Sequence, residues 1–108
     1  MYDKGQGVPQ DYAEAAGWYH KAADEGDAEA QTTLGVMYAH GQGVPQDFVS
    51  AHMWFNLAAA RGGKNAEEWR AIVAQLMTLE QIAEAQKLAR EWKPTKQPDE
   101  IGRRASMR

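Results

Sequence analysis

Gly-Gln-Gly-Val-Pro-Gln-Asp occupies residues 5–11, and the same heptapeptide returns unchanged at 41–47, a shift of 36 residues. Sliding residues 1–36 onto 37–72 also pairs Trp18 with Trp54, and Tyr19 with Phe55 as a conservative aromatic match. Self-similarity at a period of about 20 to 50 residues is typical of repeat proteins. The sequence therefore predicts stacked copies of one unit.

The heptapeptide is predicted to be a loop between two antiparallel helices. Gly41 can take the left-handed conformation that ends a helix, and Pro45 disfavours helix at the residue before it. Asp47 can then cap the next helix, as Asp11 is expected to do in the first copy. The Gly-x-Gly pattern does not continue into a phosphate-binding motif, so no phosphate site is predicted.

Apolar residues recur at helical spacing through most of the chain and predict an all-α fold. The expected helices cover residues 12–25, 28–40, 48–61, 64–77 and 78–92. Trp18 and Trp54, each followed by alanines, are predicted to be buried framework residues. Gly35 lies inside a helix, which indicates the close approach of a partner helix. Thr78 and Gln81 predict a capping box.

These helices are expected to form one repeat domain over residues 1–92. It would contain a partial repeat at 1–26, a full repeat at 27–62, and a degenerate repeat at 63–92 that closes the C-terminal end. Residues 93–108 are rich in Lys, Arg, Pro and Gln, and a flexible basic tail is expected there. Because residues 1–4 match the end of a helix at 37–40, the chain is interpreted as a piece of a longer array rather than one beginning in mid-repeat.

Composition narrows the classes of function. The chain of 108 residues has a net charge of −3, which gives no general reason to bind nucleic acid. It has no cysteine, and therefore no disulfide, thiolate nucleophile or cysteine-ligated metal. No apolar run is long enough to insert in a membrane, and no signal-peptide core is present. The compartment stays open: a soluble cytoplasmic chain, or a periplasmic or secreted one if a longer parent carries a signal peptide.

No catalytic, cofactor or metal site is predicted. His20, His40 and His52 lack the spacing of a metal motif, and His20 and His52 are expected to be partly solvated. Adjacent carboxylates such as Glu67 and Glu68 point apart on a helix, which indicates a solvated face. Ser50 has no neighbouring base to activate it.

Residues 28–47, together with the small and aromatic residues that follow, resemble the Sel1-like repeat family, a relative of the tetratricopeptide repeats. The residues that follow are Ala51, Trp54, Phe55, Ala58, Ala59 and Gly62. The resemblance implies a right-handed superhelix of helical hairpins, about two repeats and a cap, whose concave side is lined by each repeat's first helix. Family members generally act as scaffolds or adaptors in multiprotein assemblies, often in bacterial signalling, envelope or host-interaction processes.

The function expected from this resemblance is non-catalytic: a concave helical surface that holds a protein or peptide partner. Carrying the family's concave positions onto this sequence gives a set of partner-binding candidates: Glu29, Thr32, Val36, Ala39, His40, Asn65, Glu68 and Ile72. Two alternatives stay open. One is a β-lactam-binding or hydrolase-type enzyme, against which the absence of the disulfides of such relatives argues. The other is a structural fragment that self-associates through its N-terminal end.

Overall fold

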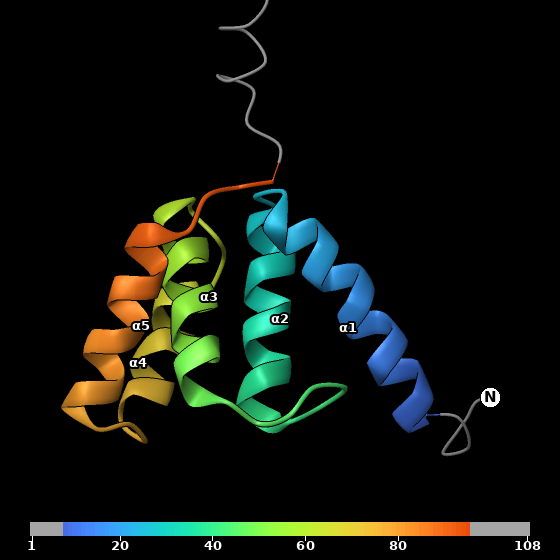
Figure 1. Cartoon of the computed structure of the whole chain (residues 1–108), viewed down its shortest axis with the longest axis horizontal. Coiled ribbons are helices and arrows are strands. Elements are labelled where there is room, and N and C mark those ends of the chain that lie inside the picture. Colours follow the sequence, from blue (N-terminus) through green and yellow to red (C-terminus); the bar gives the residue numbers. More distant parts are fainter. Residues whose placement is uncertain (1–7, 96–108) are drawn as a thin grey trace, which may run out of the picture.

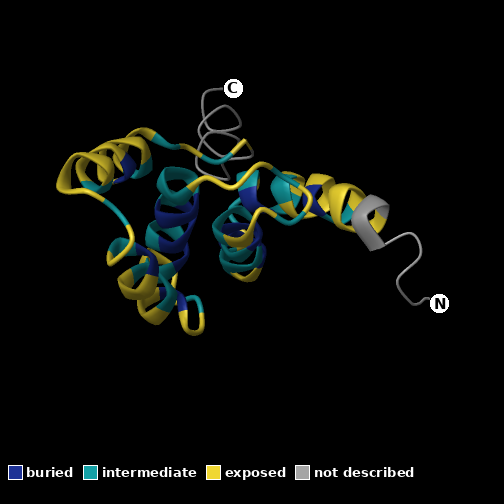
Figure 2. Ribbon diagram, turned by 90° about the horizontal axis from the view of Figure 1, so that it is seen from below, coloured by how far each residue is buried: buried dark blue, intermediate teal, exposed yellow. Residues whose placement is uncertain are grey.

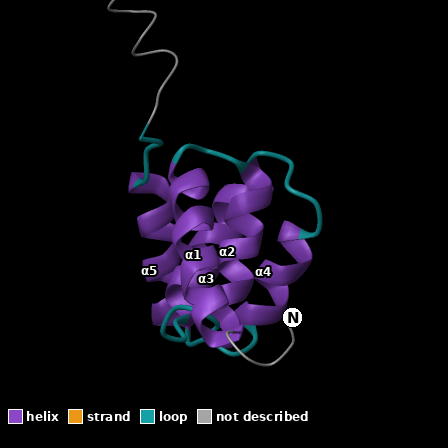
Figure 3. Cartoon of the chain, turned by 90° about the vertical axis from the view of Figure 1, so that its right-hand side faces the viewer, coloured by secondary structure: helices purple, strands orange, loops and turns teal. Residues whose placement is uncertain are grey.

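The computed structural model describes residues 8–95, which fold into helices joined by short turns, with no strand among them (Figures 1 and 3). This confirms the predicted all-α class. The helices are α1 (Val8–Asp24), α2 (Ala28–His40), α3 (Phe48–Ala60), α4 (Ala66–Ala74) and α5 (Leu79–Glu91).

The helices are arranged as a helical repeat solenoid with α3 at its centre. Helices α2, α4 and α5 all pack against α3, whereas α1 packs chiefly against α2 (Figure 1). Figure 2 shows buried residues gathered on the facing sides of the central helices, while α1, next to the N-terminal end, is largely exposed. We call α2 and α4 the first helices of their repeats, and α1, α3 and α5 the second helices.

Two core clusters hold α3 in place. Trp54, only 3% exposed, shares one cluster with Leu34 of α2 and with Ala23 and Ala30 from the α1–α2 hairpin. Its ring makes edge contacts with His20 of α1 at 5.7 Å and Trp92 at 6.1 Å between centroids. The other cluster contains Ala51, Phe55 and Val73. Small residues beside large rings therefore fill the centre, as the alanine and tryptophan pattern predicts.

Gly35 explains how closely α2 and α3 approach each other. A Cβ atom added at Gly35 would lie 2.5 Å from Cε1 of Phe55, so only glycine fits at this point of the interface. The predicted close approach of a partner helix is confirmed. Packing of the Phe55 ring offsets the cost of about 0.8–1 kcal/mol that glycine carries inside a helix.

The second copy of the heptapeptide is a loop, as predicted. Gly41 has a left-handed backbone with φ of 71°, and its N–H donates to the carbonyl of Met37. The Asp47 N–H donates to the Tyr38 carbonyl at 2.9 Å, and the Asp47 carboxylate accepts from the Ser50 N–H at 3.2 Å. Carbonyls at the end of α2 therefore fix both ends of this loop.

The first copy of the heptapeptide behaves differently, and the prediction for it is wrong over its described part. Helix α1 already begins at Val8, so Asp11 lies in the first turn instead of capping a helix that starts at residue 12. Pro9 is tolerated there because the first turn does not use its missing N–H. In the second copy, the loop depends on carbonyls of Met37 and Tyr38; their counterparts at 1 and 2 lie outside the described residues.

The prediction that both Trp18 and Trp54 are buried holds for Trp54 only. The Trp18 side chain is 67% exposed. The physical reason is the number of neighbours: Trp54 lies on the central helix with α1, α2 and α5 around it, whereas α1 is an outer helix. Trp18 therefore belongs to a surface within the described structure.

The last repeat departs from the predicted helices mainly in α4, which is shorter than the expected 64–77. Asn65 takes a left-handed backbone before its first turn, with φ of 66°. Ala66 and Val73 are buried, but Ile72 and Leu76 are 54% and 62% exposed, so the expected apolar stripe is only partly core. The predicted capping box of α5 is confirmed, with Thr78 and Gln81 each accepting the other's backbone N–H.

The segment that follows α5 returns to the first hairpin. The Thr95 N–H donates to the carbonyl of Asp24 at 2.7 Å, which links the segment after α5 to the last residue of α1, 71 positions earlier in the sequence. Arg61 lies over the Trp92 ring at 5.6 Å from its centroid. Residues 92–95, which we call the strap, thus cross from α5 to α1 (Figure 1). The rest of the predicted tail, 96–108, lies outside the described residues.

Candidate protein-interaction face

The two first helices, α2 and α4, both pack against α3 and contact each other. Together they form one face of the solenoid. The turn between α3 and α4 sets the start of this face. The Gly63 N–H donates to the Ala58 carbonyl at 2.7 Å, and a Cβ at Gly63 would lie 3.2 Å from Oγ1 of Thr32. This close backbone approach places the start of α4 beside the first turns of α2. We call this surface the α2–α4 face.

One end of the α2–α4 face is polar. A hollow of about 540 Å³ between the helices is lined by Glu29 and Thr32 of α2 and by Lys64 and Asn65 of the α3–α4 turn. A second hollow of about 260 Å³ continues past Asn65 to Glu68. The Thr32 hydroxyl donates to the Ala28 carbonyl, which leaves its oxygen able to accept. Carboxylates outnumber ammonium groups at this end.

The other end of the α2–α4 face is apolar. A hollow of about 230 Å³ lies between the last turn of α2 and the middle of α4. Its floor includes Phe55 and Trp69, whose rings stack at 6.0 Å between centroids and 17° between planes. The residues around this floor are Ala39, His40, Gln46, Phe48, Ile72, Val73 and Leu76. We call this hollow the apolar hollow.

The structure gathers most of the predicted partner-binding residues at these two ends. Glu29, Thr32, Asn65 and Glu68 line the polar end, and Ala39, His40 and Ile72 line the apolar hollow. Val36 lies between the two groups on α2, half-buried against the cluster of Ala51, Phe55 and Val73. His40 Nδ1 lies 2.9 Å from the Val36 carbonyl oxygen.

Sequence reasoning did not assign Lys64, Phe48, Trp69 or Leu76 to this surface, although all line its hollows. Trp69 and Leu76 fit the apolar helical spacing of the helix expected over 64–77, which indicates core rather than a binding surface. Leu76 lies beyond the end of α4 at Ala74 and is 62% exposed, which the apolar spacing of the sequence does not reveal.

The histidines do not form a site within the described part of the chain. His20 Nδ1 lies 3.1 Å from a carboxylate oxygen of Asp24, whereas His40 is exposed. His52 is 3% exposed, so the expectation that it is partly solvated is wrong. Burial lowers the pKa of His52, and the nearby Arg70 guanidinium lowers it further. No group of three potential metal ligands occurs among residues 8–95.

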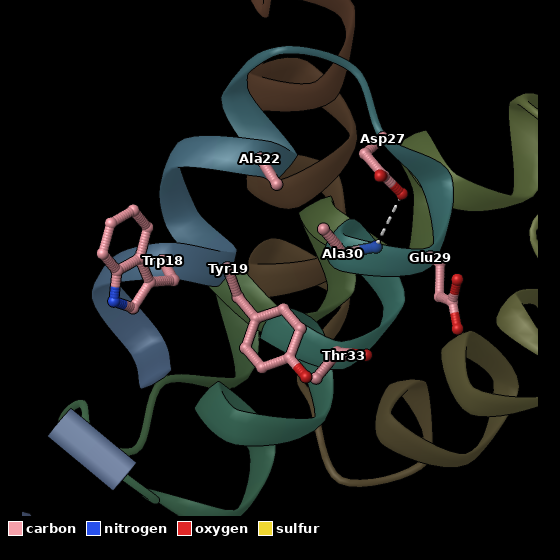
Figure 4. Close-up of a pocket in the computed structure, with 7 residues that line it drawn as sticks. All are labelled: Trp18, Tyr19, Ala22, Asp27, Glu29, Ala30 and Thr33. Atoms are coloured by element: carbon pink, nitrogen blue, oxygen red, sulfur yellow. Dashed lines mark hydrogen bonds between the residues drawn. The ribbon is translucent and has the colours of Figure 1, made fainter. Parts of the chain in front are cut away.

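Another hollow lies between α1 and α2, and of the predicted partner-binding residues it includes Glu29. It encloses about 400 Å³ and is lined by Trp18, Tyr19, Ala22, Asp27, Glu29, Ala30 and Thr33. In Figure 4 the Tyr19 ring lies toward Thr33 of α2, while the Trp18 indole projects away from it. We call this surface the α1 groove.

Comparison with known proteins agrees with the arrangement of helices. The Sel1 repeat family matches residues 1–27 and 28–63, so the chain belongs to the Sel1 repeat family. Sel1 repeats generally mediate protein–protein interactions and are typically non-catalytic scaffolds. A search of curated proteins found no match. None of the helices described here has the length and hydropathy needed to cross a membrane.

Proposed function

We propose that the chain is a protein-interaction module that binds a peptide segment of its partner along the α2–α4 face. The observation that carries this proposal is the apolar hollow, in which Ile72 and Leu76 remain more than half exposed although they lie beside the core. Exposed apolar surface next to polar groups is characteristic of interaction sites.

The two ends of the face suggest what such a segment contains. A large apolar side chain would displace water from Trp69, Ile72 and Leu76, which is favourable by about 25 cal/mol per Å² of apolar surface. The polar end offers Glu29 and Glu68, which favour basic or hydrogen-bond-donating groups. The bound segment is therefore proposed to be apolar toward the end of α2 and polar or basic toward its start.

A displayed peptide library selected on the chain tests this proposal. Peptides recovered from it should bind at least about ten-fold more weakly to an Ile72→Glu chain, because the new carboxylate would lie in the apolar hollow. Leu79→Glu is the matched control, since Leu79 is highly exposed on α5 and lines no part of the face. Affinity is measured by fluorescence polarisation of the labelled peptide.

A chain substituted at Glu29, Thr32 and His40 together tests the polar end and the apolar hollow of the α2–α4 face in one variant. Its circular dichroism should match that of the wild type, because Glu29 and His40 are exposed. Selected peptides that bind this variant and the Ile72→Glu chain as tightly as the wild type would rule out the α2–α4 face.

A further inference from the structure

The strap brings the chain to the polar end of the α2–α4 face. Its last residue, Thr95, donates both its backbone N–H and its hydroxyl to the carbonyl of Asp24, at 2.7 and 3.3 Å. Only three residues separate Asp24 from Ala28, where α2 begins (Figure 1). The chain therefore continues into residues 96–108 from a point close to the first turn of α2, which carries Glu29.

These two parts of the chain have opposite charge. Residues 96–108 contain four Lys or Arg side chains and two carboxylates, a net charge of +2, so the preceding 95 residues carry −5. The two hollows at the polar end of the face are lined by Glu29, Glu67 and Glu68, with Lys64 as the cation among them. The segment that follows the strap is thus complementary in charge to the end of the face beside which it starts.

The order of residues in this segment matches the order of the two ends of the face. Arg103 and Arg104 come first, and Met107 follows three residues later. The face is acidic at the start of α2 and apolar at its last turn. A methionine side chain adapts to an irregular apolar hollow and contacts aromatic rings favourably, and the floor of the apolar hollow includes Trp69. A segment that follows α2 from start to end presents its arginines and its methionine to matching surfaces.

The segment is long enough to reach both ends. Arg103 lies eight residues after Thr95, which an extended chain spans in up to about 26 Å, and Met107 lies twelve residues after it, or up to about 40 Å. Helix α2 has 13 residues and is about 20 Å long. The reach therefore exceeds the length of the face, so both contacts can form in one chain.

We propose that residues 96–108 bind back onto the α2–α4 face and compete there with the partner's peptide. Arg103 and Arg104 lie at the polar end in this arrangement, and Met107 lies in the apolar hollow. The inference rests on the proposed function, because it names what regulates that same face. Single exposed ion pairs are weak. A tethered segment binds at an effective concentration on the order of 1 mM, however, so contacts of millimolar affinity are enough to occupy the face for much of the time.

NMR spectra of the full chain test this docking without any partner. An Arg103→Glu, Arg104→Glu chain should show shifted amide signals at Glu29 and Glu68, because the reversed charges leave the polar end. Raising the salt to about 1 M, where the Debye length is about 3 Å, should move the same signals of the wild-type chain in the same direction.

Two further chains complete the NMR experiment. Lys87→Glu with Arg90→Glu makes the same change in net charge at two exposed positions of α5, and it should leave the signals of the polar end in place. Met107→Ser should shift the indole signal of Trp69, because the apolar hollow loses its occupant while the arginines remain. Circular dichroism of each chain checks that the helices are intact.

Competition is measured with the peptides selected from the displayed library. They should bind the Arg103→Glu, Arg104→Glu chain about three-fold more tightly than the wild type, because the tethered competitor has been released. The chain with Lys87→Glu and Arg90→Glu has the same net charge and should bind like the wild type. The comparison separates release of the segment from a general attraction between a more acidic chain and a basic peptide.

Unchanged Glu29 and Glu68 signals in the Arg103→Glu, Arg104→Glu chain would overturn the proposal, as would equal peptide affinity of this chain and its charge-matched control. Shifts that depend on the concentration of the wild-type chain would assign the face to the segment of a second copy, which also overturns binding within one chain. Failure of the proposed function looks different. Selected peptides would then be insensitive to Ile72→Glu, whereas the NMR shifts report the segment in the absence of peptide.

Discussion

Two glycines in the middle of helices show how differently one residue type can act. At Gly35 an added Cβ would lie 2.5 Å from the Phe55 ring, whereas at Gly17 it would meet nothing within 4 Å. Both glycines carry the same backbone cost, but only Gly35 gains packing in return. Gly35 is therefore required by the α2–α3 interface, and Gly17 is not required by any described contact.

This difference gives a matched pair of substitutions. Gly35→Ala should lower the free energy of unfolding by about 1–3 kcal/mol, because the methyl group forces the Phe55 ring to move. Gly17→Ala should raise it by about 0.5–1 kcal/mol, because alanine favours the helix and finds open space. Urea unfolding followed by circular dichroism measures both. A change of the same sign in the two variants would contradict this account of Gly35.

His52 should make stability depend on pH. Its ordinary pKa is 6.5, and burial together with Arg70 lowers the pKa in the folded chain. The unfolded chain therefore takes up a proton that the folded chain resists. Stability should be fully present above pH 6.5 and decrease as the pH falls below it toward the folded pKa. Urea midpoints at about pH 7.5 and about pH 5 measure the decrease.

The control for His52 uses a second histidine. A His52→Leu chain should lose less stability over the same pH range, whereas His40→Gln should behave like the wild type because His40 is exposed. An equal decrease in the His52→Leu chain would assign the pH dependence to other groups.

At the scale of the helices, the caps were the most predictable features. Asp47 and Thr78 were expected from the sequence, and each accepts a backbone N–H three residues on. A cap is a local interaction among a few neighbours in the sequence, so its pattern is visible without the fold. The start of α1 was mispredicted because the loop of the second copy depends on carbonyls of Met37 and Tyr38, and the heptapeptide alone does not carry those contacts.

The cap of α5 can be tested alone. Thr78→Ala should lower the free energy of unfolding by about 1 kcal/mol, because the Gln81 N–H loses its acceptor and half of the capping box is removed. Gln86→Ala on the exposed side of the same helix should not lower it. Thermal melting of the two variants provides the measurement. If Thr78→Ala melts at the wild-type temperature, the capping box does not stabilise α5.

At the scale of the whole molecule, the strap was not predictable from sequence. Its contacts join Thr95 to Asp24 and Trp92 to Trp54, residues that no local pattern connects. The candidate site was only partly predictable for a similar reason. Polar positions such as Glu29 and Asn65 follow the repeat, whereas the exposure of Ile72 beside the buried Val73 depends on how α4 packs against α3.

The strap predicts a difference between two truncations. A chain ending at Thr95 keeps the Trp92 and Thr95 contacts and should unfold like the full chain. A chain ending at Glu91 loses them and should be less stable by about 2–3 kcal/mol, below the 3–5 typical of a fully buried tryptophan because Trp92 is half-buried. Hydrogen exchange should show the largest loss of protection in α1. Equal stability of the two truncations would show that the strap contributes nothing.

The duplicated heptapeptide has a consequence for how α1 would respond to a neighbour. Its second copy is held open by the terminal carbonyls of α2, while the described residues of its first copy wind into α1 from Val8. If another helix ended beside the first copy, as α2 ends beside the second, its last carbonyls would compete with those of α1 for the N–H groups of the first turn of α1. Binding of that helix would then unwind the first turn of α1, so the same heptapeptide would be extended beside a helix end and helical without one.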